Sequence, residues 1–406
     1  MSVLSVVIPA YNEQDGISNI IERVLAIKSS LFEAGIKDLE LIVVDDGSCD
    51  RTAEIASVYQ EVKLIRHPVN QGYGAALKTG FRHAKGDLLA FLDADGTYPP
   101  EEFPRLCRAA LEQKADLVIG SRMAGMESQM PLVRRLGNTI FAVLVSLVSN
   151  HSVSDSASGM RVLRREMLPY LYPLPDGLNF TPVMSTRALH ENVKMVEVPI
   201  SYRERVGHSK LSILGDGTRF FSSIVWTALN YNPARILGGI GLVGLTVASG
   251  IGGVLVVMRL QGINYLGPWG VLGVFAALVL GVAGVSIFTL GAAFNYLVSL
   301  FHKRPVRQGL LGRPLFQKPL EHHFGWLGLL TIIGGLVLGT VSMALGLAGW
   351  PITRLWFYLL LSAMAVLIGL QLVVSWVMMC TLAELSKREV KIEKDVNGTD
   401  TDSFHG

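Results

Sequence analysis

The stretch from Leu88 to Thr97 reads Leu-Leu-Ala-Phe-Leu-Asp-Ala-Asp-Gly-Thr, an apolar run that ends in two aspartates one residue apart. An apolar run of this length, followed by polar turn residues, predicts a short buried strand. Asp93 and Asp95 would stand at the carboxyl end of that strand, where an open α/β sheet binds its ligand. Two carboxylates on one turn can face the same hard cation. The motif is weak on its own, because aspartates also cap helices, so the surrounding sequence decides what it means.

Apolar runs of the same kind recur along the first part of the chain, with helical patterns between them. Alternating strands and helices are typical of a mostly parallel sheet that is covered by helices on both faces. Residues 1–232 are therefore predicted to form an α/β domain with a Rossmann-like sheet. The other predicted strands are 4–8, 39–44, 62–65 and 117–120, and the predicted helices are 13–32, 74–84 and 100–113.

Polar residues follow the other predicted strands, and they should meet the two aspartates at one rim. They are Pro-Ala-Tyr-Asn-Glu at 9–13, Asp-Asp-Gly-Ser at 45–48 and Ser-Arg at 121–122. Clustered carboxylates repel one another unless a cation or a hydrogen-bonding ligand joins them. Mg²⁺ and Mn²⁺ are commonly held by one or two carboxylates together with substrate phosphates. The rim therefore favours a nucleoside diphosphate with its metal.

Two other phosphate-binding motifs do not fit the sequence. The chain has no Gly-Xaa4-Gly-Lys-Ser/Thr loop, and Gly72-Tyr73-Gly74 lacks the third glycine of a dinucleotide fingerprint. We interpret these glycines as a tight turn that leads into a helix.

Four long stretches without charge follow Arg235, at 236–258, 260–301, 324–353 and 355–383. A helix that spans a membrane needs roughly 20 predominantly apolar residues. Four transmembrane helices are therefore predicted, near 236–258, 270–300, 325–349 and 355–382, within an all-α domain at 233–384. The alternative, an unusually apolar soluble core, is disfavoured because four such runs follow one another.

The loop at 302–323 is basic, with Lys303, Arg304, Arg307, Arg313 and Lys318 against Glu321. The positive-inside rule places such a loop in the cytoplasm. An even number of spans then places both the α/β domain and the solvated tail at 385–406 on that side. We expect an integral membrane protein in the plasma membrane of a prokaryote, with a cytoplasmic catalytic domain.

Composition excludes several other classes. Of the 406 residues, 50% are hydrophobic and 17% charged, and the net charge is +3, which does not suit a disordered chain. The 42 glycines have no three-residue period, so the chain is not collagenous. Three dispersed cysteines, Cys49, Cys107 and Cys380, favour free thiols over a disulfide scaffold. No nucleic-acid partner is expected.

Six motifs occur in a fixed order along the first part of the chain. They are Pro9-Ala-Tyr-Asn-Glu13, Val44-Asp-Asp-Gly-Ser48, Asp93-Ala-Asp95, Gly120-Ser-Arg122, Ser158-Gly-Met-Arg161 and Gly207-His-Ser-Lys210. This set resembles family 2 glycosyltransferases, and within them the polyprenyl-phosphate sugar transferases of the dolichol-phosphate mannose synthase type. The resemblance implies a GT-A-type fold, a divalent metal and a single inverting sugar transfer to polyprenyl phosphate.

The resemblance also assigns donor-side roles. Pro9, Tyr11 and Glu13 would line the base and ribose, and Asp46 would bond the base. Asp93 would lie toward the ribose and the metal, and Asp95 would ligate Mg²⁺ or Mn²⁺ through the diphosphate of a UDP-glucose or GDP-mannose type donor. Structural readings remain open for these residues: a turn proline, a packed tyrosine and helix caps. One departure is Thr97, since relatives tend to carry a glutamine there that can join the metal.

On the acceptor side, residues 131–149 form an apolar pattern that begins with proline and is too short to span a membrane comfortably. We interpret it as an interfacial helix. Arg134 and Asn138 share one of its faces, and by the resemblance this pair and Arg122 would bind the phosphate of undecaprenyl or dolichyl phosphate. The alternative is a core helix whose arginines reach outward to solvent.

The remaining candidate residues are Asp155 and a basic loop. By the resemblance Asp155 lies near the reacting centre, where it would orient groups or balance charge; ordinary turn capping is the alternative. Arg205 and Lys210, with Arg203 and Ser209, occupy a loop just before the first span and would close over the diphosphate, with attraction to the membrane surface as the alternative.

Three rival functions are open. A processive polysaccharide synthase would carry a Gln-Xaa-Xaa-Arg-Trp string, which the sequence lacks. A non-catalytic nucleotide-sugar-binding membrane protein would use the acids for structure alone. A coupled transporter usually needs Asp, Glu, Lys or Arg inside its spans, and the four stretches have none of these. Their glycines would allow close helix packing and a homo-oligomer.

Overall fold

The computed structural model describes residues 2–123, 130–149, 152–191, 193–202, 213–263, 267–302 and 321–397. The chain forms two compact units, Met1–Ala228 and Leu229–Gly406, which are described separately below.

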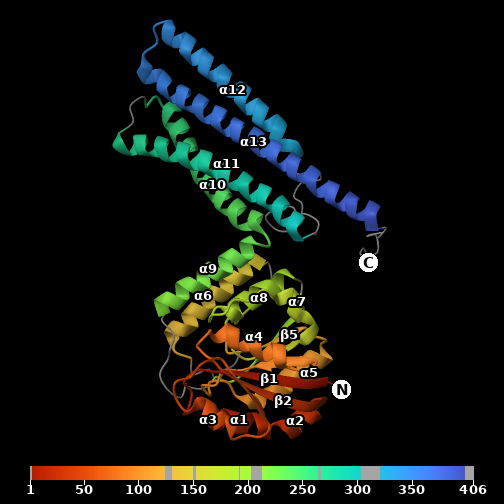
Figure 1. The fold of residues 1–406 in the computed structure, drawn as a ribbon. Helices are drawn as coiled ribbons and strands as arrows, with labels where there is room; N and C mark the ends of the chain where they lie inside the picture. Colours follow the sequence, from red (N-terminus) through yellow and green to blue (C-terminus); the bar gives the residue numbers. More distant parts are fainter. Residues whose placement is uncertain are drawn as a thin grey trace. The chain divides into compact units, whose positions relative to one another are not determined.

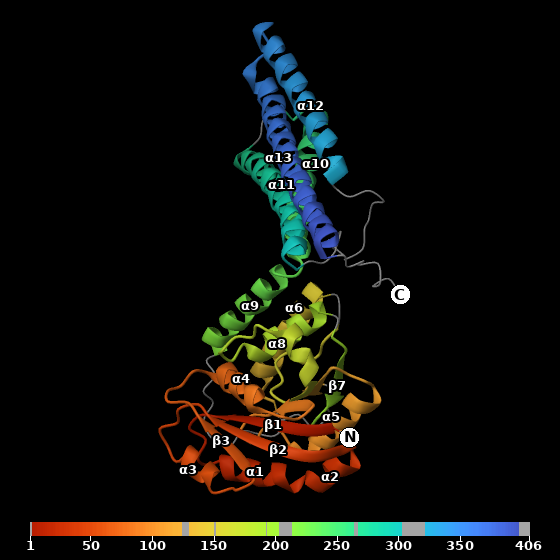
Figure 2. The ribbon, with the colours of Figure 1, turned by 45° about the vertical axis from the view of Figure 1, so that its right-hand side comes forward.

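The first unit is built on one seven-stranded sheet with the order β3-β2-β1-β4-β6-β5-β7 (Figures 1 and 2). All described strands run parallel to one another except β6, which is antiparallel to both of its neighbours. The strands are β1 (Ser2–Ala10), β2 (Ile36–Asp45), β3 (Val62–Arg66), β4 (Leu88–Phe91), β5 (Leu117–Ser121), β6 (Arg161–Arg164) and β7 (Met195–Pro199).

Helices cover both faces of this sheet, and the period of two along each strand decides which core a side chain joins. In β1, Val6 and Ile8 join one buried cluster while Val7 joins the other. The first cluster packs under α1 (Ile17–Ala26), α2 (Lys28–Glu33), α3 (Thr52–Ser57) and α5 (Phe103–Glu112). The second packs under α4 (Tyr73–His83), α7 (Leu168–Leu171) and α8 (Phe180–His190).

Several local predictions were wrong. The helix expected at 13–32 is two helices, α1 and α2, because Ile27 leaves helical geometry with φ −82° and ψ 3°. The sequence patterns did not predict β6, β7, α3, α7 and α8. They also did not predict α9 (Ile213–Leu229), which lies in the sequence between the basic loop and the first long apolar helix.

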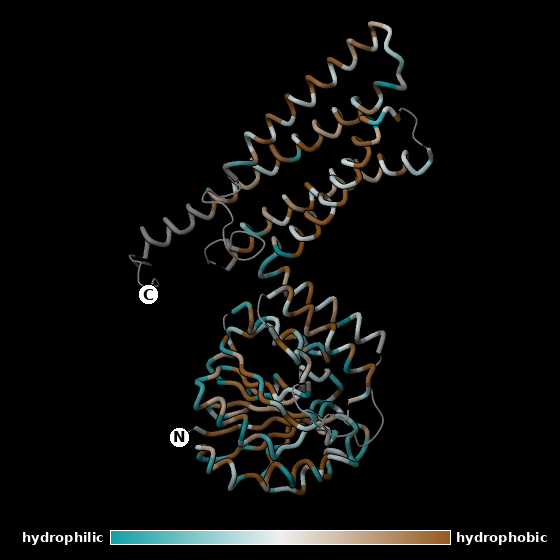
Figure 3. Tube along the Cα trace, turned by 180° about the vertical axis from the view of Figure 1, so that it is seen from behind, coloured by the Kyte–Doolittle hydropathy of each residue, from teal (hydrophilic) through white to brown (hydrophobic). Residues whose placement is uncertain are grey.

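The second unit consists, in its described part, of four long helices: α10 (Pro233–Leu260), α11 (Pro268–His302), α12 (Glu321–Leu347) and α13 (Ile352–Asn397). Each carries a segment long and apolar enough to cross a membrane, which confirms the prediction of four such helices. Figure 3 shows the apolar residues continuing along these helices. α13 extends past the predicted span into the expected tail, so that the tail is helical as far as Asn397.

Glycines allow two close helix pairs in this unit. A Cβ at Gly241 of α10 would come within 2.6 Å of the Gly284 carbonyl of α11, and a Cβ at Gly369 of α13 would come within 2.7 Å of the Gly328 carbonyl of α12. Buried Ala293, Phe324 and Met379 join α11, α12 and α13. The helices therefore pack backbone against backbone, as small residues permit inside membranes.

Candidate active site

The predicted rim forms where β1, β2 and β4 end. β1 is the central strand of the three, and its Ala10 is paired with Asp45 at the end of β2. Since β4 runs parallel to β1, Asp93 follows it at the same edge of the sheet. The motifs at 9–13, 45–48 and 93–95 therefore follow neighbouring strand ends, as the sequence predicts.

Asp46 is buried, with 3% of its surface exposed, and its carboxylate organises the loop that follows β3. Oδ1 accepts the N–H of Gln71 at 2.9 Å and lies 2.7 Å from Nδ1 of His67; Oδ2 accepts the N–H of Gly72 at 2.8 Å. On its other side, His67 Nε2 lies 3.0 Å from Thr79 Oγ1. The sequence analysis missed His67, although it too follows a strand end.

The turn at Gly72 and Tyr73 links Asp46 to Asp93. Gly72 has φ 105°, a conformation that favours glycine, and α4 begins at the next residue, as the sequence predicts. The Tyr73 hydroxyl donates to Asp93 Oδ1 at 2.8 Å. Burial, followed by the nearby Asp93 charge, raises the pKa of Tyr73, so this hydroxyl stays a donor. Gly72 therefore contacts Asp46 and the adjacent Tyr73 contacts Asp93, so this turn holds the two carboxylates at one edge of the sheet.

Asp95 is held by Thr97, which lies two residues further along the chain. Its Oδ1 accepts both the N–H of Thr97, at 3.1 Å, and the Thr97 hydroxyl, at 2.6 Å. Thr97 has no exposed surface. We conclude that the hydroxyl of Thr97 orients the Asp95 carboxylate.

The acidic pair fits a divalent cation only together with substrate. Among the described residues, no group of three or more His, Cys, Asp and Glu side chains could hold a metal ion. Mg²⁺ and Mn²⁺ accept one or two protein carboxylates and take further oxygens from substrate phosphates. Asp93 and Asp95 would be the two protein ligands, and a donor diphosphate would supply the rest.

The loop after β1 is tied to the loop after β2 by hydrogen bonds. The backbone N–H groups of Asn12, Glu13 and Gln14 donate to the side chains of Ser48, Thr52 and Asp50 respectively, at 2.9, 2.8 and 3.2 Å. Asn12 has φ 50°, which Asn tolerates better than most residues. Pro9 lies within β1, and Tyr11 and Glu13 follow it on this loop. The predicted donor residues therefore sit on a loop of defined shape.

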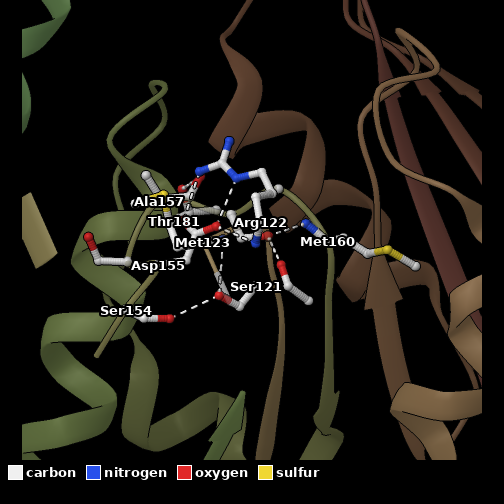
Figure 4. Close-up of polar contacts among 12 residues, drawn as sticks. Ser121, Arg122, Met123, Ser154, Asp155, Ala157, Met160 and Thr181 are labelled. Atoms are coloured by element: carbon white, nitrogen blue, oxygen red, sulfur yellow. Dashed lines mark hydrogen bonds and ion pairs between the residues drawn. The ribbon is translucent and has the colours of Figure 1, made fainter. Parts of the chain in front are cut away.

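Arg122 is a cation that several contacts hold in place. Its Nε and Nη2 donate to the two oxygens of Asp155, each at 2.8 Å, and its own N–H donates to the same carboxylate at 2.9 Å (Figure 4). The guanidinium also lies over the rings of Tyr98 and Tyr202, 5.8 and 5.4 Å from their centroids. Among the described residues, its third nitrogen has no hydrogen-bond partner.

The pair stays charged although it is buried. Asp155 has no exposed surface, and burial alone would raise the pKa of its carboxyl, but the charge and hydrogen bonds of Arg122 lower the pKa below its ordinary value. Burial would likewise lower the pKa of Arg122, and Asp155 reverses this and raises it. Arg122 is therefore a permanent cation with one edge left for an anion.

Tyr98 connects the acidic pair to this cation. Its hydroxyl accepts the N–H of Gly159 at 2.7 Å. Gly159 packs against Asp93 so closely that a Cβ there would lie 2.5 Å from Asp93 Oδ2. Since the Arg122 guanidinium lies over the ring of the same tyrosine, the acidic pair and the cation lie close to each other.

Arg161, at the start of β6, is a second buried cation. Its Nε and Nη2 donate to the carbonyls of Ser158, at 3.1 Å, and Ser156, at 2.8 Å. Burial, partly offset by Asp155, lowers the pKa of Arg161 to about 10. Arg161 closes the Ser158-Gly-Met-Arg161 motif, and the sequence alone predicted no role for it.

The acceptor-side residues are only partly described. The backbone of Arg134 lies in α6 (Leu132–Ser149), but its side chain is outside the description, as are Arg203, Arg205, Ser209 and Lys210. Asn138 is 6% exposed, and both polar atoms of its side chain lack a partner among the described residues. Since an unpaired buried amide costs about 1–3 kcal/mol, Asn138 stays a candidate for binding a ligand.

α6 and α9 present an apolar surface on this unit. They lie side by side in both ribbon views, and Phe141 of α6 packs on Phe220 of α9 with ring centroids 5.7 Å apart (Figures 1 and 2). The exposed apolar residues are Leu132, Val133, Leu136, Ile140, Val143 and Leu147 on α6, and Phe221 and Trp226 on α9. We call these eight residues the apolar platform.

Comparison with known proteins assigns both parts of the chain. A model described as glycosyl transferase family 2 matches residues 5–171, and one described as a domain of unknown function, DUF8752, matches residues 233–393. A solved glucosyl-3-phosphoglycerate synthase from Mycobacterium tuberculosis, in complex with Mn²⁺, UDP and phosphoglyceric acid, has a TM-score of 0.47 and 23% identity, and the match covers 56% of this chain and 78% of that one.

Two curated relatives are more similar in sequence. The chain is 33% identical to the low-salt glycan biosynthesis hexosyltransferase Agl6 of Haloferax volcanii, over 61% of this chain and 60% of that protein, less than two thirds of its length. It is 31% identical to the undecaprenyl-phosphate 4-deoxy-4-formamido-L-arabinose transferase of Edwardsiella ictaluri, over 74% of this chain and 90% of that protein. The fold class and the resemblance expected from the motifs are confirmed, and the chain belongs to glycosyl transferase family 2.

Proposed function

We propose that this protein transfers one sugar, with inversion, from a nucleotide sugar to a polyprenyl phosphate, giving a lipid-phosphate-linked sugar at the cytoplasmic face of the membrane. The observation that carries the proposal is that Tyr98 contacts both the Arg122 guanidinium and Gly159, which packs against Asp93. An acidic pair suited to a metal-bound diphosphate and a fixed cation suited to a phosphate share one site. The names of the two relatives support a sugar transferase and, in one case, an undecaprenyl-phosphate acceptor.

On the donor side, the loop of Pro9, Tyr11 and Glu13 would hold the nucleoside. Asp46 would contact the base through the lone pairs of Oδ2 that its bond to Gly72 leaves available. Mg²⁺ or Mn²⁺ on Asp93 and Asp95 would neutralise charge on the leaving diphosphate. Arg205 and Lys210, which lie outside the described residues, remain predicted to close over that diphosphate.

On the acceptor side, Arg122, Arg134 and Asn138 would bind the lipid phosphate. A phosphate monoester is largely a dianion at neutral pH, so its oxygen can attack the sugar without a strong general base. Both oxygens of the Asp155 carboxylate accept hydrogen bonds from Arg122, and the residue has no exposed surface. We therefore assign Asp155 to orienting Arg122 rather than to proton transfer. The fixed guanidinium would hold the attacking oxygen in line with the departing diphosphate.

A turnover assay tests the proposal. The purified full-length chain is incubated with Mg²⁺ or Mn²⁺, a panel of UDP- and GDP-sugars, and undecaprenyl or dolichyl phosphate, and the products are identified by mass spectrometry. One sugar on one lipid phosphate is the expected product. A polymer would indicate a processive synthase, and the absence of turnover with every donor and acceptor in the panel would indicate a protein that only binds nucleotide sugars.

The metal assignment is tested by Asp95→Asn. Because the variant removes one carboxylate from the site, we expect transfer to fall at least about a hundredfold while thermal unfolding stays close to wild type. The matched control is Asp38→Asn, since Asp38 is an exposed carboxylate near the start of β2, away from the rim. Full transfer by Asp95→Asn would refute the assignment.

A further inference from the structure

The carboxylate of Glu197 lies behind Asp155 and has no part in the site described so far. Glu197 is in β7, the edge strand, opposite Ile119 of β5. Its Oε1 accepts the N–H groups of Ser154 and Asp155 at 2.9 and 3.0 Å, and its Oε2 accepts the Ser154 hydroxyl at 2.7 Å. One carboxylate thus holds the backbone from which the partner of Arg122 projects.

The same segment is also joined to the strand that carries Arg122. The hydroxyls of Ser121 and Ser154 are 2.9 Å apart (Figure 4). Ser158 donates its hydroxyl to the carbonyl of Gly120 at 2.6 Å. The end of β5 is therefore held by the 154–158 segment, and that segment is held by Glu197. A shift of the Ser154–Asp155 backbone would move the carboxylate that receives two guanidinium hydrogen bonds.

We propose that Glu197 is a positioning residue for the acceptor side, which fixes the Arg122 guanidinium through the Ser154–Asp155 backbone and the Asp155 carboxylate; this inference rests on the proposed function. Three donors converge on one carboxylate, and hydrogen bonds to charged groups are stronger than neutral ones. A cation that is already held in place loses little conformational entropy when a phosphate binds. Loss of Glu197 should therefore weaken acceptor binding and leave donor binding unchanged.

The variant Glu197→Leu keeps similar bulk and removes both acceptor atoms. For the full-length chain in detergent, we expect the Kd for undecaprenyl phosphate to rise about tenfold, the scale of one lost charge-assisted hydrogen bond. The Kd for UDP or GDP, whichever the wild type binds, should stay within about twofold. Glu197→Gln retains one acceptor oxygen, and since the Ser154 hydroxyl can reorient toward its amide, affinity should return to within about threefold of wild type.

A double variant tests the route through Arg122. In an Arg122→Ala background, Glu197→Leu should cause no further loss of affinity for undecaprenyl phosphate, because the group that it positions is gone. An additional tenfold loss there would overturn the inference. The matched control is Glu166→Leu, since Glu166 is an exposed glutamate of the same unit that forms an ion pair with Arg164, and it should change neither affinity.

Undecaprenol, which lacks the phosphate, separates this inference from the proposed function. Wild-type protein that binds undecaprenyl phosphate no better than undecaprenol would overturn both. Wild-type discrimination that Glu197→Leu leaves intact would overturn the role of Glu197 alone. A loss of nucleotide affinity in Glu197→Leu equal to the loss of lipid affinity would also overturn it, because a general structural defect would then explain both.

Discussion

Asp155 links the stability of the first unit to pH. Its pKa in the folded chain lies below the ordinary value of 3.8, since Arg122 outweighs the opposing effect of burial. A depressed carboxyl pKa stabilises the fold at pH values above the unfolded pKa, and this stability is lost as the pH falls through the folded pKa. Asp155→Asn should therefore flatten the acid side of the stability curve and destabilise the fold by about 3 kcal/mol at neutral pH.

Thermal unfolding of the full-length chain, from neutral pH down to about pH 3, measures this effect. Asp38→Asn is again the control, because its ion pair with Lys28 is exposed and such pairs contribute little. An Asp155→Asn variant that loses stability on acidification as steeply as wild type would contradict the assignment.

The bond between Thr97 and Asp95 leads to a prediction about the Mg²⁺ dependence of transfer. Thr97→Val keeps the shape of the side chain and removes the hydroxyl that donates to Asp95 Oδ1 at 2.6 Å, while the bond from the Thr97 N–H is kept. The concentration of Mg²⁺ needed for half-maximal transfer should rise, by about threefold to tenfold. Thr97→Ser restores the hydroxyl and should restore the metal response. Equal metal dependence in all three proteins would show that the hydroxyl is not needed to orient Asp95.

At the scale of elements, strand ends were predictable and strand neighbours were not. Asp45, Asp46, Asp93 and Asp95 follow apolar runs, and a run that stops at a polar motif can be read along the chain. The contact of Asp46 with His67 needs β2 and β3 to be adjacent, and adjacency is a three-dimensional property. The Tyr73–Asp93 bond depends in the same way on where α4 begins.

β6 explains why the acceptor side was harder to predict. Its four residues begin and end with arginine, so their composition does not indicate a strand. It inserts antiparallel between β4 and β5, and that order brings the Ser158–Arg161 motif beside Asp93 and Arg122. Glu197 was invisible for a related reason, because a half-buried edge strand gives a weak pattern and its partners lie 42 and 43 residues away in the chain.

The close pair of α12 and α13 makes a prediction about packing. A Cβ at Gly369 would lie 2.7 Å from the Gly328 carbonyl and 2.8 Å from the Ile332 nitrogen, both of which are backbone atoms. Gly369→Ala should therefore separate the helices and cost about 1–3 kcal/mol, as overpacking does. Gly334→Ala is the control, since a Cβ there meets nothing within 4 Å. Unfolding in detergent measures both variants, and equal stability would mean that the contact is not tight.

At the scale of the whole molecule, both the apolar platform and the four long helices expose large apolar side chains. Leu136 of α6 and Trp226 of α9 are 64% and 65% exposed, although both side chains are large and apolar. A soluble surface rarely carries such a continuous patch, and a lipid interface does. α9 ends at Leu229 and the first apolar helix begins at Pro233, so the chain near the end of α9 lies within a few residues of a membrane span.

We therefore predict that α6 and α9 lie in the headgroup region of the bilayer, where tryptophan is favoured. Cys49, Cys107 and Cys380 are first replaced by serine, and the full-length chain is then spin-labelled at Leu136→Cys or Trp226→Cys and placed in lipid vesicles. Both labels should collide readily with oxygen, which concentrates in lipid, and poorly with a water-soluble nickel complex. Val58→Cys is the control, because Val58 is an exposed apolar residue at the end of α3 and should show the reverse. If the labels at Leu136 and Trp226 behave like the one at Val58, α6 and α9 do not contact lipid. Arg134 and Asn138 would then have to bind a phosphate that leaves the bilayer.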